Sequence, residues 1–339
     1  MIELDGVASV ADVARVQALR RGSAPALVFE GRAMTFADVD AMASRLANAL
    51  IASGVRTQAR IAYLSKNTDH FLPCLIGACK ARAALAPFNF RLAAPEIARL
   101  LEDSEARIMF VGPDVVDLAD QAVASLVSKP RMIALGFDRQ RYERYDAWID
   151  SAAPQDPLLE ADPQDDVVQL YTSGTTGLPK GVQLTNRNYL AAFELTAAPG
   201  GLNYEPGETV LAAMPFFHVA GVNVALIAMA SGARSAILRD AAPHLILDVI
   251  GKERVSHAFL APALIQMLMQ APGIGSADLS SMRVLSSGAS PISEAVLKQA
   301  SARFRCEFIQ VYGLTEICGA GTFLASADQI GRASCRERV

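Results

Sequence analysis

Residues 171–181, with the sequence YTSGTTGLPKG, combine the residue types that bind phosphate groups. Glycines let backbone N–H groups approach an anion closely, and hydroxyl side chains add further donors. Lys180 adds a mobile positive charge that suits the outer phosphates of a nucleotide. We therefore predict a polyphosphate-binding loop whose contributing residues are Thr172, Ser173, Gly174, Thr175, Thr176, Gly177, Lys180 and Gly181.

Two other interpretations of this loop are weaker. A flexible surface turn is disfavoured because an unbroken run of glycine and hydroxyl residues precedes Pro-Lys-Gly. A Walker A loop has glycine directly before its lysine and serine or threonine directly after it. Here Pro179 precedes Lys180 and Gly181 follows it, so the spacing does not fit a P-loop kinase or GTPase.

The loop resembles the signature of the adenylate-forming superfamily, which includes acyl-CoA synthetases, peptide-synthetase adenylation domains and luciferases. Residues 311–316, VYGLTE, end a predicted strand and resemble the second nucleotide motif of that family. The resemblance implies that Tyr312 stacks on adenine beside Gly313, that Thr315 meets the α-phosphate and that Glu316 ligates Mg²⁺. A carboxylate beside a phosphate needs a cation between them, and Mg²⁺ takes oxygen ligands. Taken alone, these residues could be a strand end followed by a helix cap.

Two further segments resemble the same family. Residues 286–291, SSGASP, resemble the loop that holds adenine and lines the acyl pocket, where Gly288 and Ala289 allow close approach of a flat ligand. Alone, this segment could be a turn before a helix. Residues 214–221, MPFFHVAG, resemble the aromatic-histidine segment, which implies that His218 lies near the carboxylate or the tunnel entrance. A buried structural histidine is the alternative. We also expect pocket contacts from Phe217, Val222 and Ala225.

The family resemblance implies a two-step reaction. A carboxylate attacks the α-phosphorus of ATP to give an acyl-adenylate, and coenzyme A then displaces AMP. The acid is itself the nucleophile, so Lys180, His218, Thr315 and Glu316 are expected to position groups and stabilise charge. The apolar surroundings of His218 favour a fatty or other apolar acid over an amino acid. An acyl-AMP ligase, an aryl-CoA ligase and a non-catalytic ATP- or acyl-binding module stay open.

The elements that must position these residues alternate between strand and helix, which predicts parallel βαβ units. The resemblance implies an α/β fold, the large N-terminal domain of an adenylate-forming enzyme, with two subdomains of mainly parallel sheets packed by helices. We expect the first subdomain over 1–160 and the second, with the ATP motifs, over 161–329, joined by a Pro- and acid-rich connector at 151–163. We expect strands at 26–30, 33–36, 60–64, 84–87, 107–111, 167–171, 210–215, 235–238, 257–260, 282–286 and 307–312. Expected helices include 10–20, 70–79, 94–103 and one that begins at 186. A further helix should begin at a capping box formed by Thr35 and Asp38.

Composition limits the class of protein. The chain has 339 residues, 52% hydrophobic and 19% charged, which is typical of a folded globular protein with more than one subdomain. A net charge of -4 disfavours nucleic acid as a partner. The longest apolar stretch, about 220–230, is too short to span a bilayer, and no export signal is evident. Five cysteines without metal-ligand spacing favour a reducing cytoplasm. A homodimer is left open.

The last ten residues, IGRASCRERV, differ from the rest of the chain. The codons ATC GGA AGA GCG TCG TGT AGG GAA AGA GTG encode this peptide and resemble a common sequencing adapter. We predict that 330–339 is such an artefact and set it apart from the fold; a genuine basic tail is the alternative. The natural protein is then expected to continue beyond about residue 329. No match to the family's ribose-binding Asp, hinge or C-terminal catalytic lysine is found, so we expect this fragment to be inactive or nearly so.

Overall fold

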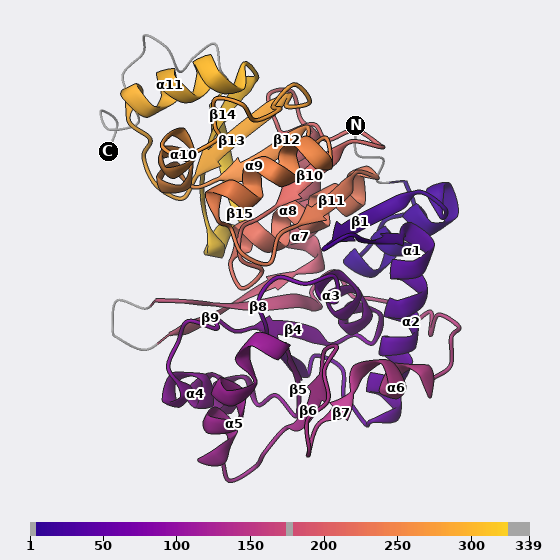
Figure 1. Cartoon of the computed structure of the whole chain (residues 1–339). Helices are drawn as coiled ribbons and strands as arrows, with labels where there is room; N and C mark the ends of the chain where they lie inside the picture. Colours follow the sequence, from indigo (N-terminus) through magenta and orange to yellow (C-terminus); the bar gives the residue numbers. More distant parts are fainter. Residues whose placement is uncertain (1–4, 174–178, 325–339) are drawn as a thin grey trace.

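The computed structural model describes residues 5–173 and 179–324. In this part of the chain, a seven-stranded sheet lies beside an eight-stranded sheet, with helices between them and on both outer faces (Figure 1). This is the mixed α/β architecture, with two mainly parallel sheets packed by helices, that the sequence predicts.

The first sheet has the strand order β7-β6-β5-β3-β4-β8-β9. Neighbouring strands are parallel except for the antiparallel pair β8 and β9. Its inner strands are continuous apolar runs, because helices cover both faces. The strand bounds are β3 Arg60–Leu64, β4 Ala84–Pro87, β5 Ile108–Val111, β6 Arg131–Ala134, β7 Glu143–Arg144, β8 Asp166–Thr172 and β9 Lys180–Thr185.

The second sheet has the strand order β15-β14-β13-β12-β10-β11-β1-β2. Antiparallel hairpins form both edges, and the strands between them are parallel. The bounds are β1 Pro25–Phe29, β2 Arg32–Thr35, β10 Thr209–Ala212, β11 Arg234–Ile237, β12 His257–Leu260, β13 Val284–Gly288, β14 Glu307–Leu314 and β15 Gly319–Leu324.

Helices form three layers around the sheets of the described chain. The largest core lies between the sheets and includes α1 (Val10–Arg21), α2 (Phe36–Ala52), α3 (Phe71–Lys80), α7 (Asn186–Ala197) and α8 (Val219–Ser231). The outer face of the first sheet packs on α4 (Ala94–Ser104) and α5 (Val116–Ala124). The outer face of the second sheet packs on α9 (Pro243–Lys252), α10 (Pro262–Met269) and α11 (Glu294–Phe304). The short elements are η1 (Pro113–Val115), α6 (Tyr145–Asp150) and η2 (Thr315–Ile317).

Helix starts follow the local sequence. Thr35 caps α2, and the Asp38 side chain accepts a hydrogen bond from the Thr35 N–H, which confirms the predicted capping box. Helix α8 is apolar on every side because it is buried between the sheets. In the described ranges no helix is long and apolar enough to cross a membrane.

The sheets do not follow the expected subdomain boundary at residue 160. Strands β8 and β9, which follow that boundary, join the first sheet. Strands β1 and β2, from the start of the chain, complete the far edge of the second sheet. The chain therefore crosses between the sheets twice, once between β2 and β3 and once between β9 and β10. The connector at 151–163 lies within the stretch that leads from α6 to β8.

Candidate functional site

The predicted phosphate loop joins β8 to β9, so it is the loop of an antiparallel hairpin rather than the turn from a strand into a helix. Thr172 and Lys180 face each other directly across this hairpin. Directly opposite residues of an antiparallel pair point to the same face of a sheet. Ser173 and Lys180 are exposed, and four predicted residues lie outside the described ranges: Gly174, Thr175, Thr176 and Gly177.

The base of the hairpin is held from its other face. Tyr171 donates a hydrogen bond to Asp103 at 2.6 Å and accepts one from Gln169 at 2.8 Å. Burial, followed by the Asp103 carboxylate, raises the pKa of Tyr171. A side chain at Gly181 would start 2.5 Å from the Gln169 amide nitrogen, which fits glycine at this position. The loop therefore leaves the sheet from a fixed base.

The VYGLTE segment spans the end of β14 and η2. Tyr312 is 63% exposed, as a ring that receives a flat ligand must be. A Cβ at Gly313 would lie 1.8 Å from the carbonyl oxygen of Gly319, so only glycine lets β14 and β15 pair here. Glu316 lies in η2, and its Oε1 is 3.5 Å from Thr172 Oγ1. Thr172, at the end of a strand in the first sheet, therefore meets Glu316, in the turn between two strands of the second sheet, 144 positions later.

The SSGASP segment begins on β13, next to β14. Gly288 pairs with Val311, and a Cβ at Gly288 would lie 2.6 Å from the Val311 carbonyl oxygen. Ala289 follows with a positive φ of 68°, which turns the chain away from the sheet. The small residues that the sequence singles out thus border the strand that carries Tyr312.

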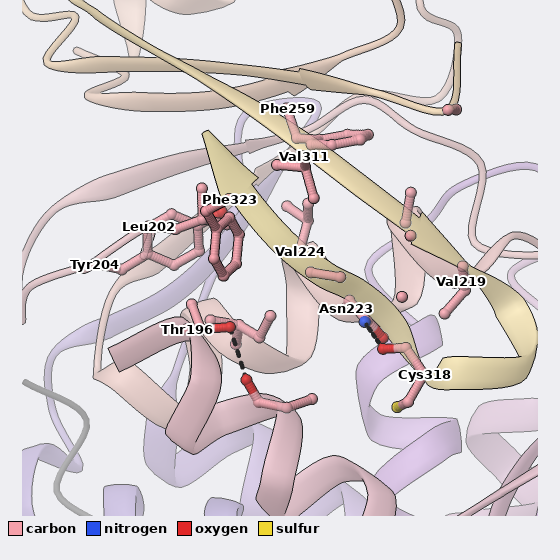
Figure 2. A pocket seen from close by; sticks show the side chains of 17 residues that line it. Thr196, Leu202, Tyr204, Val219, Asn223, Val224, Phe259, Val311, Cys318 and Phe323 are labelled. Carbon is pink, nitrogen blue, oxygen red and sulfur yellow. Dashed lines mark hydrogen bonds between the residues drawn. The ribbon is translucent and has the colours of Figure 1, made fainter. Parts of the chain in front are cut away.

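An apolar pocket of about 110 Å³ lies beside these motifs (Figure 2). Its wall includes Ala289 from the SSGASP segment and Gly313 from the VYGLTE segment. Helix α8 contributes one face to the pocket. The other lining residues come from α7, the loop before β10, β12, the turn after β13, β14, the end of η2 and β15. The full lining is Ala192, Thr196, Leu202, Tyr204, Val219, Ala220, Asn223, Val224, Ile227, Phe259, Ala289, Val311, Gly313, Cys318, Gly319, Ala320 and Phe323.

Three residues expected to contact the acid, Phe217, Val222 and Ala225, lie elsewhere. Val222 and Ala225 are fully buried in the core between the sheets, and Phe217 packs on Phe90 at 5.3 Å between ring centres. None of these three residues lines the pocket. Because α8 is apolar all round, its hydrophobic pattern does not distinguish the pocket face from the core face.

His218 is the N-cap residue of α8, but its side chain makes no capping hydrogen bond. Its ring lies 4.4 Å from that of Phe217, and the Arg91 guanidinium lies 5.5 Å from the Phe217 ring. His218 is exposed, but desolvation by its neighbours and then the charge of Arg91 lower its pKa, which favours a neutral imidazole. His218 itself does not line the pocket, whereas the next residue, Val219, does.

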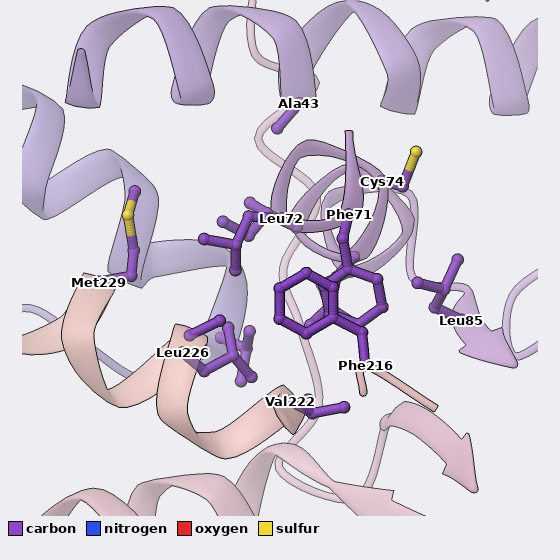
Figure 3. Close-up of a cluster of buried hydrophobic side chains, with 14 of the residues drawn as sticks. Ala43, Phe71, Leu72, Cys74, Leu85, Phe216, Val222, Leu226 and Met229 are labelled. Carbon is purple, nitrogen blue, oxygen red and sulfur yellow. The ribbon is translucent and has the colours of Figure 1, made fainter. Parts of the chain in front are cut away.

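Asn67 fixes the segment that precedes His218, and the sequence does not reveal this role. Its amide donates to the Met214 carbonyl at 3.0 Å, and its carbonyl accepts from the Phe216 N–H at 2.9 Å. The Phe216 ring stacks on Phe71 of α3 with centres 4.3 Å apart (Figure 3). The first sheet thereby holds the start of α8. The signal in the sequence is weak, because Asn67 is only one of several polar residues that follow the apolar strand β3.

Glu316 is a candidate ligand for a metal ion. Across the described residues, no group of three or more His, Cys, Asp or Glu side chains gathers as in a dedicated metal cage. Mg²⁺ typically binds one or two carboxylates together with substrate phosphates and water. One accessible carboxylate beside a phosphate-loop residue fits that pattern.

Known proteins with similar sequences are acid ligases. Fatty acid–[acyl-carrier-protein] ligase ScoC from Streptomyces coeruleorubidus is 34% identical over 309 residues, covering 90% of this chain and 58% of the relative. Long-chain-fatty-acid–CoA ligase FadD13 from Mycobacterium tuberculosis is 32% identical over 308 residues, covering 90% and 59%. The chain therefore spans less than two thirds of the length of both relatives.

Solved structures match the fold closely. The inhibitor-bound N-terminal domain of FACL13 from Mycobacterium tuberculosis matches with a TM-score of 0.87 and 29% identity, over 96% of this chain and 82% of that one. A sequence model of the family described as AMP-binding enzyme matches residues 14–337. The matched range includes most of residues 330–339, the segment that we predict from the sequence to be an artefact. Because the match covers almost the whole chain, the protein belongs to the AMP-binding enzyme family.

Proposed function

We propose that this chain is the ATP- and acid-binding part of an AMP-forming acid–CoA ligase. The observation that carries the proposal is the meeting of Thr172 and Glu316 beside an apolar pocket whose wall includes Gly313 and Ala289. A phosphate loop, a carboxylate that can bind a metal ion and a neighbouring apolar pocket are what the activation of a carboxylic acid requires. Similarity to acid–CoA ligases supports the same reaction.

In this proposal the chain positions its substrates and supplies no nucleophile. Thr172, Ser173 and Lys180 contact the outer phosphates, as do the loop residues between them. Tyr312 stacks on adenine against Gly288 and Ala289, and Thr315 donates to the α-phosphate. Mg²⁺ bound to Glu316 would neutralise phosphate charge. The pocket holds the apolar part of the acid, so that its carboxylate attacks the α-phosphorus and pyrophosphate leaves.

His218 takes a positioning role at the start of α8. With its pKa lowered, the neutral ring can donate a hydrogen bond to the acid carboxylate without carrying a full charge. The second step, in which the CoA thiol displaces AMP, forms the thioester. We further propose that the enzyme acts in the cytoplasm, which the free state of the four described cysteines supports. Assembly as a homodimer is a further expectation that gel filtration would test.

The experiment is a pyrophosphate-release assay on the product of the complete gene. The panel holds straight-chain and aromatic carboxylic acids of graded length, each with ATP and Mg²⁺, with and without CoA. We expect release that depends on the acid and thioester formation that depends on CoA. ATP hydrolysis that proceeds equally without any acid would contradict the proposal.

A further inference from the structure

Asn223 carries an unused hydrogen-bond acceptor in the wall of the apolar pocket. The residue is 8% exposed, and its Nδ2 donates to the Cys318 carbonyl at 2.8 Å (Figure 2). Its Oδ1 is buried and has no hydrogen-bond partner among the described residues. A buried acceptor without a donor is unfavourable, so its retention in a ligand pocket points to a donor that arrives with the ligand.

The orientation of this amide is fixed by its neighbours. Gly319, which has a φ of 97°, follows Cys318, and a Cβ there would lie 2.4 Å from Asn223 Nδ2. The glycine thus lets the amide approach the backbone closely enough to donate to Cys318. Since Nδ2 must face that carbonyl, Oδ1 is the atom left without a partner.

Asn223 also joins the pocket to the nucleotide motif. Cys318 ends the η2 turn that contains Thr315 and Glu316. A single amide therefore contacts, through Nδ2, the backbone two residues after the candidate metal ligand, while its Oδ1 keeps no partner among the described residues. A ligand that binds Oδ1 stabilises the amide that holds this turn.

The pocket sets the size of the group that reaches Asn223. Its volume of about 110 Å³ is of the same order as the apolar cavity of about 150 Å³ that accommodates benzene. Most of its wall is aliphatic or aromatic. The Thr196 hydroxyl already donates to the Ala192 carbonyl at 2.7 Å, whereas the buried Tyr204 hydroxyl has no partner.

We propose that the acid pocket selects a carboxylic acid with a single-ring tail that carries a hydroxyl group, and that Asn223 determines this specificity by accepting a hydrogen bond from that hydroxyl. This inference rests on the proposed function, because it takes the pocket as the acid site.

The test is the affinity of this chain for four acids, measured by isothermal titration calorimetry in the presence of ATP. The acids are 3-phenylpropanoic acid and its ortho-, meta- and para-hydroxy isomers, which move one donor around the same ring. At least one hydroxy isomer should bind about tenfold more tightly than the unsubstituted acid, because it satisfies a buried acceptor that otherwise stays unpaired.

Two variants assign the effect to an atom. Leucine has a volume similar to that of asparagine but no hydrogen-bond acceptor. In Asn223→Leu the hydroxy isomer should therefore bind less than about twofold more tightly than the unsubstituted acid. Tyr204→Phe is the matched control, because it removes the other unpartnered polar atom of the wall and should leave the preference intact. The wild-type panel needs no variant, so the proposal stays testable if Asn223→Leu does not fold.

Each outcome is informative. Equal binding of all four acids to the wild type would contradict the substrate class while leaving the acid pocket in place. A preference that survives Asn223→Leu and disappears in Tyr204→Phe would overturn the role of Asn223. Failure of every acid to bind, together with no acid-dependent pyrophosphate release by the complete gene product, would instead refute the proposed function.

Discussion

Removal of the Asn67 side chain should destabilise the protein and loosen the acid site together. Asn67 is 4% exposed and satisfies two backbone groups, the Met214 carbonyl and the Phe216 N–H. In Asn67→Ala both groups lose their partner inside the protein. Each buried group left unsatisfied costs about 1–3 kcal/mol, so the free energy of unfolding should fall by about 2–6 kcal/mol.

The assay combines urea unfolding with substrate kinetics. The sequence has one tryptophan, Trp148, which is buried and reports unfolding by fluorescence. In the complete gene product, the KM for the acid should rise more than the KM for ATP, because Asn67 holds the segment that leads into α8 and its pocket face.

Asn48 provides the matched control. Its amide also makes two hydrogen bonds to backbone carbonyls, those of Ala153 and Gln155, but at a partly exposed position. Asn48→Ala should change the unfolding free energy by less than about 1 kcal/mol and leave both KM values unchanged. If Asn67→Ala were no more destabilising than Asn48→Ala, Asn67 would not hold the segment as we argue.

Three further predictions concern other parts of the structure. The fully buried Lys80 ammonium pairs with Asp40 at 2.6 Å and with Asp156 at 2.5 Å. Lys80→Met should therefore lower the free energy of unfolding by about 3 kcal/mol in chemical denaturation. A decrease below about 1 kcal/mol would contradict a paired core lysine. Burial and then the Arg283 charge lower the pKa of His257 to about 4 from 6.5, so its contribution to stability is complete above pH 6.5 and is lost as the pH falls towards 4. Between pH 6.5 and 4 the wild type should lose about 3 kcal/mol of unfolding free energy through His257, and His257→Gln should lose less. Equal dependence of the unfolding free energy on pH in the two proteins would contradict this role of His257. Gly313→Ala should prevent β14–β15 pairing and abolish ATP binding in calorimetry, and binding at wild-type affinity would refute the close contact with Gly319.

Local patterns predicted the elements that depend on local physics. Apolar runs such as 60–64 and 84–87 form buried strands, and the Thr35–Asp38 capping box starts α2 where expected. Strand β9 was missed because its sequence, KGVQLT, mixes glycine and polar residues at a sheet edge. Strand β15, GAGTFL, was missed for the same reason. Edge strands are only partly buried, so their sequences carry a weaker apolar signal.

Long-range pairing could not be derived from the sequence. Nothing near Pro25 indicates that β1 pairs with β11 some 200 residues later, so the subdomain boundary at 160 separates strands that share a sheet. The same limit applies to the site. The motifs identified Thr172 and Glu316 individually, whereas their contact depends on how the two sheets pack. Asn67 and Asn223 gain their roles from neighbours that are distant in sequence.

The most direct test of one nucleotide site shared by both sheets is acid-dependent isotope exchange between ATP and pyrophosphate. The product of the complete gene is compared with Glu316→Gln, which keeps the side-chain shape and removes the charge. Exchange should require the acid and Mg²⁺, and it should fall by roughly a hundredfold in the variant. Exchange without acid, or exchange at the wild-type rate in Glu316→Gln, would contradict an adenylate-forming site built from Thr172 and Glu316.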